Sequence, residues 1–189
     1  MDVSALVTRI RDHYVEQFQS FADEQQSRYR QGASEVKMQL SEESPVFARL
    51  YCADFVGNDT QSRVIELSPD TFLSFDRITG SYGESTLIIQ HLQWDDILLH
   101  HDVEAISEAD LHAWFQRWFD PDDARREADA EISCVIHSLL VAPHLLSVDF
   151  GTAEPEALWE MLDLLENSGA STITISSSRA EAEEAETDQ

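Results

Sequence analysis

The chain has 189 residues, of which 42% are apolar and 26% charged, a balance typical of a globular domain large enough to fold without disulfides or a metal. It carries 37 acidic residues against 12 basic ones, which gives a formal net charge of −25 at pH 7. Because nucleic acids and anionic membranes both select basic surfaces, this charge argues against either of them as the partner.

The negative charge increases along the sequence. Residues 1–50 contain eight acidic and six basic side chains, whereas residues 151–189 contain ten acidic side chains and one arginine. A GC-rich genome or the saline cytoplasm of a halophilic organism explains such a composition, since salt screens the repulsion between carboxylates. Mimicry of DNA by rows of carboxylates is a third explanation.

The two cysteines and the first residues indicate the compartment. Cys52 and Cys134 are far apart and form no CxxC pair, so we expect buried, reduced thiols, and neither lies in a sequence context typical of a catalytic nucleophile. The start of the chain lacks the apolar core of a signal peptide, and no apolar run approaches the roughly 18 residues of a membrane span. These features predict a cytoplasmic protein.

Hydrophobic periodicity predicts one long helix followed by strands. Apolar side chains recur every three or four residues from Val3 to Phe21, and this helix ends by Gly32. From residue 34 to about residue 102, short apolar runs alternate with turn residues, which predicts an antiparallel β meander. Its strands are predicted over residues 35–40, 46–56, 62–67, 72–78, 85–92 and 96–103.

Two further helices are predicted after the meander. Ser107 is placed to cap a helix with an aromatic face that ends at Phe119, and the Asp120–Pro121 pair predicts a short acidic helix that runs to about residue 130. Residues 131–141 fit either a helix or the first arm of a hairpin. Pro143 favours the hairpin, because proline cannot donate to a strand ladder and marks a tight turn.

The end of the chain predicts a β-α-β unit with a strand at 145–150, a helix at 154–168 and a strand at 171–177. Large apolar residues then cease, which predicts a disordered acidic tail over residues 179–189. Residues 1–178 are therefore predicted as a single α+β domain. It comprises an N-terminal helix, an antiparallel β meander, then helices, a β hairpin and a C-terminal β-α-β unit, with the last strands pairing with the earlier ones.

One polar cluster has the residue types of a metal site. His91, Asp96, His100 and Asp102 offer imidazole and carboxylate ligands that suit zinc, iron or manganese. Neighbouring residues of a strand point to opposite faces, so His100 and His101 cannot both join the carboxylates, and a solvated sheet surface is the preferred interpretation. No phosphate-binding loop, dinucleotide fingerprint or nucleophile elbow occurs, so we expect no cofactor.

The helix predicted over residues 154–168 offers a candidate partner-binding surface. Trp159 lies at the edge of that helix beside a polar stripe that contains Glu156, Glu160 and Asp163. Tryptophan is enriched in protein–protein interfaces, and carboxylates beside it add charge selectivity. These four residues are therefore the predicted contact site for another protein.

The sequence favours a non-enzymatic, acidic, protein-binding module, an adaptor or chaperone-like protein whose negative field steers a partner protein towards it. Two alternatives stay open. One is a metal-dependent enzyme built on the His/Asp cluster, and the other is a DNA mimic that inhibits a DNA-binding protein. The sequence is also compatible with a homo-oligomer.

Overall fold

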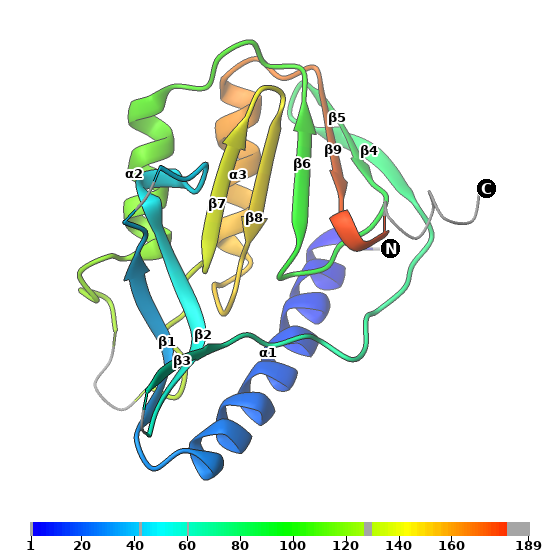
Figure 1. Ribbon diagram of the computed structural model, residues 1–189. Coiled ribbons are helices and arrows are strands. Elements are labelled where there is room, and N and C mark those ends of the chain that lie inside the picture. Colours follow the sequence, from blue (N-terminus) through cyan, green and yellow to red (C-terminus); the bar gives the residue numbers. More distant parts are fainter. Residues whose placement is uncertain (1, 42, 60, 127–129, 181–189) are drawn as a thin grey trace, which may run out of the picture.

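The computed structural model describes residues 2–41, 43–59, 61–126 and 130–180, which form an α+β fold with three α-helices and nine strands within these ranges (Figure 1). The elements are, in chain order, α1 (Val3–Arg28), β1 (Gly32–Gln39), the 3-10 turn η1 (Phe47–Arg49), β2 (Leu50–Asn58), β3 (Ser62–Ile65), β4 (Ile78–Tyr82), β5 (Ser85–Ile89), β6 (Ile97–His101), α2 (Glu108–Phe119), β7 (Ser138–Ala142), β8 (Leu145–Asp149), α3 (Glu156–Asn167) and β9 (Thr172–Ser176).

The strands form two sheets. β1, β2 and β3 make an antiparallel three-stranded sheet, and the other six strands are arranged in the order β4-β5-β9-β6-β8-β7. The last strand of the chain, β9, is inserted between β5 and β6, parallel to the first and antiparallel to the second. The expected long-range pairing is therefore confirmed, and the predicted meander is divided between the two sheets.

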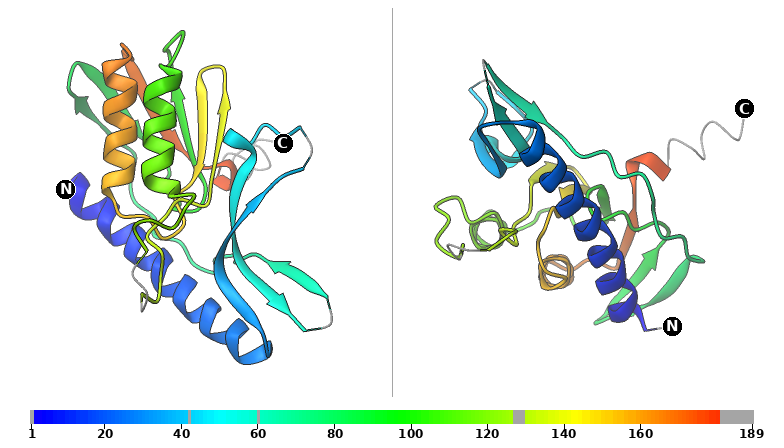
Figure 2. Two further views of the ribbon diagram at one scale, coloured as in Figure 1. Left: turned by 90° about the vertical axis from the view of Figure 1, so that its left-hand side faces the viewer. Right: turned by 90° about the horizontal axis from the view of Figure 1, so that it is seen from below.

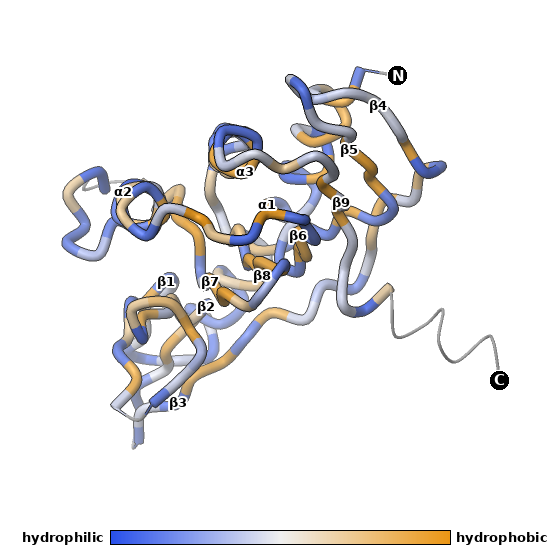
Figure 3. Tube along the Cα trace, turned by 90° about the horizontal axis from the view of Figure 1, so that it is seen from above, coloured by the Kyte–Doolittle hydropathy of each residue, from blue (hydrophilic) through white to orange (hydrophobic). Residues whose placement is uncertain are grey.

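The helices cover one face and one end of the six-stranded sheet. α2 and α3 lie side by side on one face, and α1 crosses the end of the sheet at which β7 begins (Figures 1 and 2). The apolar face predicted for α2 is buried, with Trp114, Phe115 and Trp118 at most 5% exposed. Hydrophobic stretches of β5, β6 and β8 lie beneath the helices, whereas α3 turns hydrophilic residues outward (Figure 3).

Most of the predicted C-terminal half is confirmed. Ser107 caps α2 by accepting a hydrogen bond from the amide of Asp110 at 3.3 Å. Residues 138–149 form the β7–β8 hairpin, with His144 in the left-handed region at its turn. β8, α3 and β9 form the β-α-β unit, and both of its strands pair antiparallel with β6, which lies between them.

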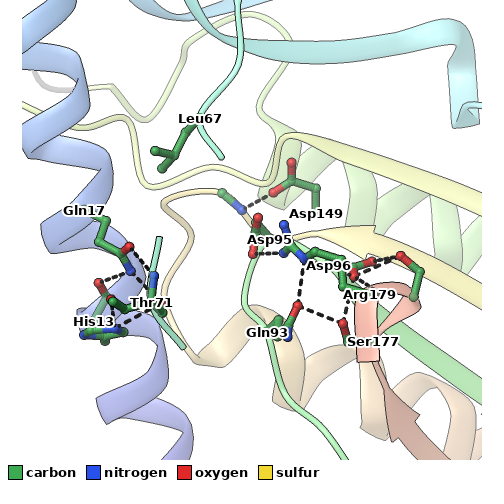
Figure 4. Close-up of polar contacts among 12 residues, drawn as sticks. His13, Gln17, Leu67, Thr71, Gln93, Asp95, Asp96, Asp149, Ser177 and Arg179 are labelled. Atoms are coloured by element: carbon green, nitrogen blue, oxygen red, sulfur yellow. Dashed lines mark hydrogen bonds and ion pairs between the residues drawn. The ribbon is translucent and has the colours of Figure 1, made fainter. Parts of the chain in front are cut away.

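The strand predicted over residues 72–78 is wrong, because this segment packs against α1 instead of a neighbouring strand. Gln17 accepts hydrogen bonds from the amides of Asp70 and Thr71 and donates to the Thr71 carbonyl at 3.1 Å (Figure 4). The alternation in this segment reflects Leu73 and Phe75, which pack against the hydrophobic core. β4 begins only at Ile78, the last residue of the predicted strand, and runs to Tyr82.

The acidic helix predicted after Asp120 is also wrong. Asp120 has a φ of 49° and Asp123 a φ of 54°, and two left-handed residues so close together cannot continue a helix. The Asp120 carboxylate instead accepts hydrogen bonds from the amides of Ala124 and Arg125, which closes a compact turn. Residues 127–129 lie outside the described ranges.

The ordered structure continues past Ser178. Arg179 and Ala180 pack against the fold, and Ala180 is only 7% exposed. Residues 181–189 of the predicted tail lie outside the described ranges. Among the helices that the structure describes, none combines the length and the apolar character needed to cross a membrane.

Two glycines provide a test of the backbone geometry. A Cβ atom added to Gly80 or to Gly169 would meet nothing within 4 Å, but only Gly169, which follows α3, has a positive φ, of 89°. We expect Gly169→Ala to lower the free energy of unfolding by about 1 kcal/mol, because alanine disfavours this conformation. Gly80→Ala should leave it unchanged or raise it by about 0.5 kcal/mol. Urea denaturation measures both, and equal effects would contradict the prediction.

Candidate functional site

The four candidate metal ligands do not converge. Asp96 precedes β6 and accepts hydrogen bonds from Ser177, Ser178 and the amide of Arg179. Asp102 follows β6, at the other end of the strand, where it accepts from the amide of Ser171 at 2.9 Å.

The two histidines of that set occupy separate positions as well. His100 lies within β6, with Nε2 3.2 Å from Ser176 Oγ, and His91 lies in the loop between β5 and β6. Within the described ranges, no group of three or more His, Cys, Asp or Glu side chains is arranged to hold a metal ion. The four His and Asp residues are therefore close in the sequence, along one strand and its adjoining loops, but they do not form one metal site.

Two of the predicted partner-binding residues hold the β4–β5 hairpin against α3. Trp159 stacks on the ring of Tyr82, with ring centroids 6.2 Å apart and planes 11° from parallel. The Tyr82 hydroxyl donates to Asp163 Oδ1 at 2.6 Å, and burial together with this hydrogen bond raises the pKa of Tyr82. The half-exposed position of Trp159 therefore has a local structural explanation.

The other two predicted residues differ from each other. Glu160 joins α3 to α2, because its Oε2 accepts from the indole of Trp118 at 2.7 Å and its Oε1 lies 2.9 Å from the Arg117 guanidinium. Glu156 is exposed in the first turn of α3. Three of the four predicted side chains thus belong to contacts between elements.

Glu160 and Asp163 also line a groove of about 560 Å³ between α2 and α3. Its apolar part comprises Ala113, Trp114 and Leu164. The remaining lining residues are polar, charged or small, and comprise Ala105, Ser107, Asp110, Arg117, Asn167 and Ser168. The groove combines apolar surface with three carboxylates and one arginine.

A buried charge cluster, which sequence analysis missed, lies where the two sheets meet. His137 at the start of β7 has Nδ1 2.8 Å from Asp54 Oδ1 on β2 and Nε2 3.4 Å from Glu35 Oε1 on β1. The Glu35 carboxylate also accepts from the Ser133 amide at 2.6 Å and from the Thr152 hydroxyl. The side chains of His137 and Glu35 are at most 2% exposed.

The cluster shifts the pKa values of its members. Burial opposes a charge on His137, but pairing with Asp54 and Glu35 outweighs it and raises the pKa well above the usual value. Burial likewise opposes ionisation of Glu35, yet the hydrogen bond from His137 and its positive charge lower the pKa of that carboxyl. His137 is therefore an imidazolium held between two carboxylates at neutral pH.

Two neighbours of the cluster are held in their neutral forms. Burial raises the pKa of the Cys52 thiol to about 12, so this thiol stays protonated and is no activated nucleophile. Burial also raises the pKa of Asp149 to about 8, against the opposing effect of His137. The charge cluster is enclosed by protein, and it joins residues of β1, β2 and the segment before β7.

The signal for this cluster was present in the sequence but incomplete. Asp54 interrupts a strand that is apolar on both faces, which marks a buried acid in need of a partner. Nothing in the spacing connects it to His137, which lies 83 positions further along the chain.

The comparisons with known proteins leave the site to be argued from its geometry. The chain matches no protein-family model, no curated protein and no solved structure.

The cluster predicts that stability falls as the pH rises from 6.5 to 8. Folded His137 keeps a proton that the unfolded chain loses above its ordinary pKa of 6.5, and folded Asp149 keeps a proton that the unfolded chain loses above pH 3.8. The unfolded state thus binds fewer protons in this window, and each retained proton contributes at most about 1.4 kcal/mol per pH unit. Urea denaturation in 0.5 M KCl should report the decrease.

Asparagine variants separate Asp149 from the general surface charge. Asp149→Asn removes one of the two retained protons and should make the pH dependence shallower. Asp23→Asn, at an exposed position of α1, should leave the slope unchanged. A wild-type free energy of unfolding that is constant between pH 6.5 and 8 would contradict the assignment of His137 and Asp149.

Proposed function

We propose that this protein is a non-enzymatic binding module that recognises a basic, amphipathic segment of a partner protein in the groove between α2 and α3. The observation that carries the proposal is the composition of this groove. Its apolar part is formed by Ala113, Trp114 and Leu164, and its carboxylates are those of Asp110, Glu160 and Asp163. Such a groove suits apolar anchors flanked by lysine or arginine.

The charge around the groove supports a cationic occupant. α3 carries Glu156, Glu160, Asp163 and Glu166 and no basic residue. On the neighbouring helix, Arg117 is the only lysine or arginine, and it is already paired with Glu160. A lysine or arginine that approaches these helices therefore meets carboxylates with little competing positive charge, which increases the rate of association and selects against acidic partners.

The groove is also held in a fixed shape. Glu160 is bound to both Arg117 and the indole of Trp118, and Trp114 donates to the carbonyl of Ala157 at 3.0 Å. These contacts keep the two helices at one separation. A partner then loses little free energy in ordering the surface that it binds.

Charge reversal at the groove tests the proposal. The probe is a fluorescein-labelled 16-residue peptide of lysine and leucine at helical spacing, measured by anisotropy in 150 mM KCl. Asp110 is exposed on the groove. Within the described part of the chain, its carboxylate accepts no hydrogen bond. We expect Asp110→Lys to weaken peptide binding at least tenfold.

Asp23→Lys is the matched control, because it changes the net charge by the same amount on the far part of α1. It should weaken binding less than twofold. Ala113→Tyr fills the apolar part of the groove without a change in charge, and it should also weaken binding at least tenfold. If both lysine variants weaken binding equally, or if the wild-type protein does not bind the peptide, the proposal is overturned.

A further inference from the structure

The side chain of Arg179, two residues past Ser177 at the C-terminal end of the described chain, is bound through its Nη2 and Nε atoms and through one face of its guanidinium. Its Nη2 lies 2.6 Å from Asp95 Oδ1, and its Nε donates to Gln93 Oε1 at 2.8 Å (Figure 4). Nε also lies 3.6 Å from Asp96 Oδ2. The face of the guanidinium lies over the ring of Phe72, 4.9 Å from its centroid.

This combination recognises arginine in particular. Carboxylate and amide oxygens placed around a planar fork, with an aromatic ring beneath it, favour a guanidinium over the compact ammonium of lysine. Three of the four contact residues come from the loop before β6 and one from the irregular segment before β4, so the pocket is assembled from separate parts of the fold.

The carboxylates of the pocket require a cation. The Asp95 side chain is only 11% exposed, and an unpaired carboxylate at such a depth is strongly disfavoured. Burial raises the pKa of Asp95, whereas the Arg179 guanidinium lowers it. An empty pocket would therefore retain affinity for another guanidinium.

The segment that fills the pocket is short and lies at the edge of the fold. Arg179 is the only basic residue among residues 151–189, its side chain is 37% exposed, and the preceding Ser178 is exposed. Its backbone is held by Asp96, which accepts from the Arg179 amide at 3.0 Å and from the hydroxyls of Ser177 and Ser178. Release of the segment breaks these contacts and also exposes Ser177 and Ala180, which are 0% and 7% exposed in the fold.

We propose that Phe72, Gln93, Asp95 and Asp96 form an arginine-binding pocket in which the chain's own Arg179 is a displaceable ligand. An arginine from a basic partner protein takes its place and releases the segment Ser177–Ala180. The negative net charge of −25 favours the approach of a cationic partner. The pocket is distinct from the groove between α2 and α3, and its test does not depend on that groove.

Removal of the internal ligand tests the pocket directly. The probe is the labelled peptide acetyl-Ser-Ser-Arg-Ala-amide, measured by anisotropy with Arg179→Ala protein. We expect at least tenfold tighter binding to Arg179→Ala than to wild type, because the internal competitor is absent. The same peptide with lysine in place of arginine should bind at least fivefold more weakly, and addition of Asp95→Asn should abolish the gain.

Arg179→Lys provides a second variant that keeps a cation beside Asp95 and therefore preserves the fold. It should bind the arginine peptide a few-fold more tightly than wild type, because lysine competes less well for the pocket. Equal affinity of wild type, Arg179→Lys and Arg179→Ala for the peptide would overturn the proposal, as would equal binding of the arginine and lysine peptides.

Displacement in the wild-type protein has its own readout. The Arg179 amide donates to Asp96 Oδ2 at 3.0 Å, so we expect it to be protected from hydrogen exchange. A saturating concentration of the arginine peptide should speed its exchange at least tenfold, while the core amide of Ile175 in β9 exchanges as before. Unchanged protection of the Arg179 amide at saturation would show that the segment is not displaced, and would overturn the proposal.

Discussion

The imidazolium of His137 lies between the carboxylates of Glu35 and Asp54, and this buried charge cluster ties the three-stranded sheet to the six-stranded sheet. Ions buried without a partner cost several kcal/mol each, so any shift of one sheet against the other that separates the three groups is strongly disfavoured. Residues around the His137 imidazole pack closely against it. A Cβ at Gly151, where φ is +48°, would lie 2.2 Å from His137 Cδ2, and Phe18 of α1 meets the ring edge-on. One side chain thus fixes the relative positions of two sheets and a helix.

Because the cluster is enclosed, other molecules can contact only the outer surfaces of the fold. α3 illustrates how the acidic residues divide between the two roles. Asp163 holds Tyr82 of the β4–β5 hairpin on one side, and Glu160 binds Arg117 and Trp118 of α2 on the other. These contacts use both carboxylate oxygens of Glu160 and Oδ1 of Asp163, and both residues also line the groove. The same side chains therefore contribute both to the rigidity of the helix pair and to its negative potential.

The sequence predicted the elements whose signals are local and missed the features that depend on distant partners. Helical periodicity, the capping residue Ser107 and the turn at Pro143 were sufficient for the helices and the β7–β8 hairpin. The strand at 72–78 failed because alternation cannot distinguish packing against a helix from packing in a sheet. Glu160 and Asp163 were predicted as surface residues, but their groove needs α2 as its second wall. The charge cluster joins positions 35, 54 and 137, which no spacing rule connects.

Basic residues are scarce in this chain, and three of them connect parts of the fold. Arg11 of α1 donates to the carbonyls of Thr152 and Ala153, Lys37 binds Asp123, and Arg179 binds Asp95, so each ties together parts of the fold that are distant in sequence. A surface that had become acidic only for solubility in salt would keep such ties, since their loss leaves carbonyls and carboxylates unpaired. Net charge alone therefore does not distinguish solubility from binding. Solubility does not require accessible apolar surface beside carboxylates, such as that of Ala113 and Leu164 in the groove. For this reason the proposed function rests on the groove, and the net charge only supports it.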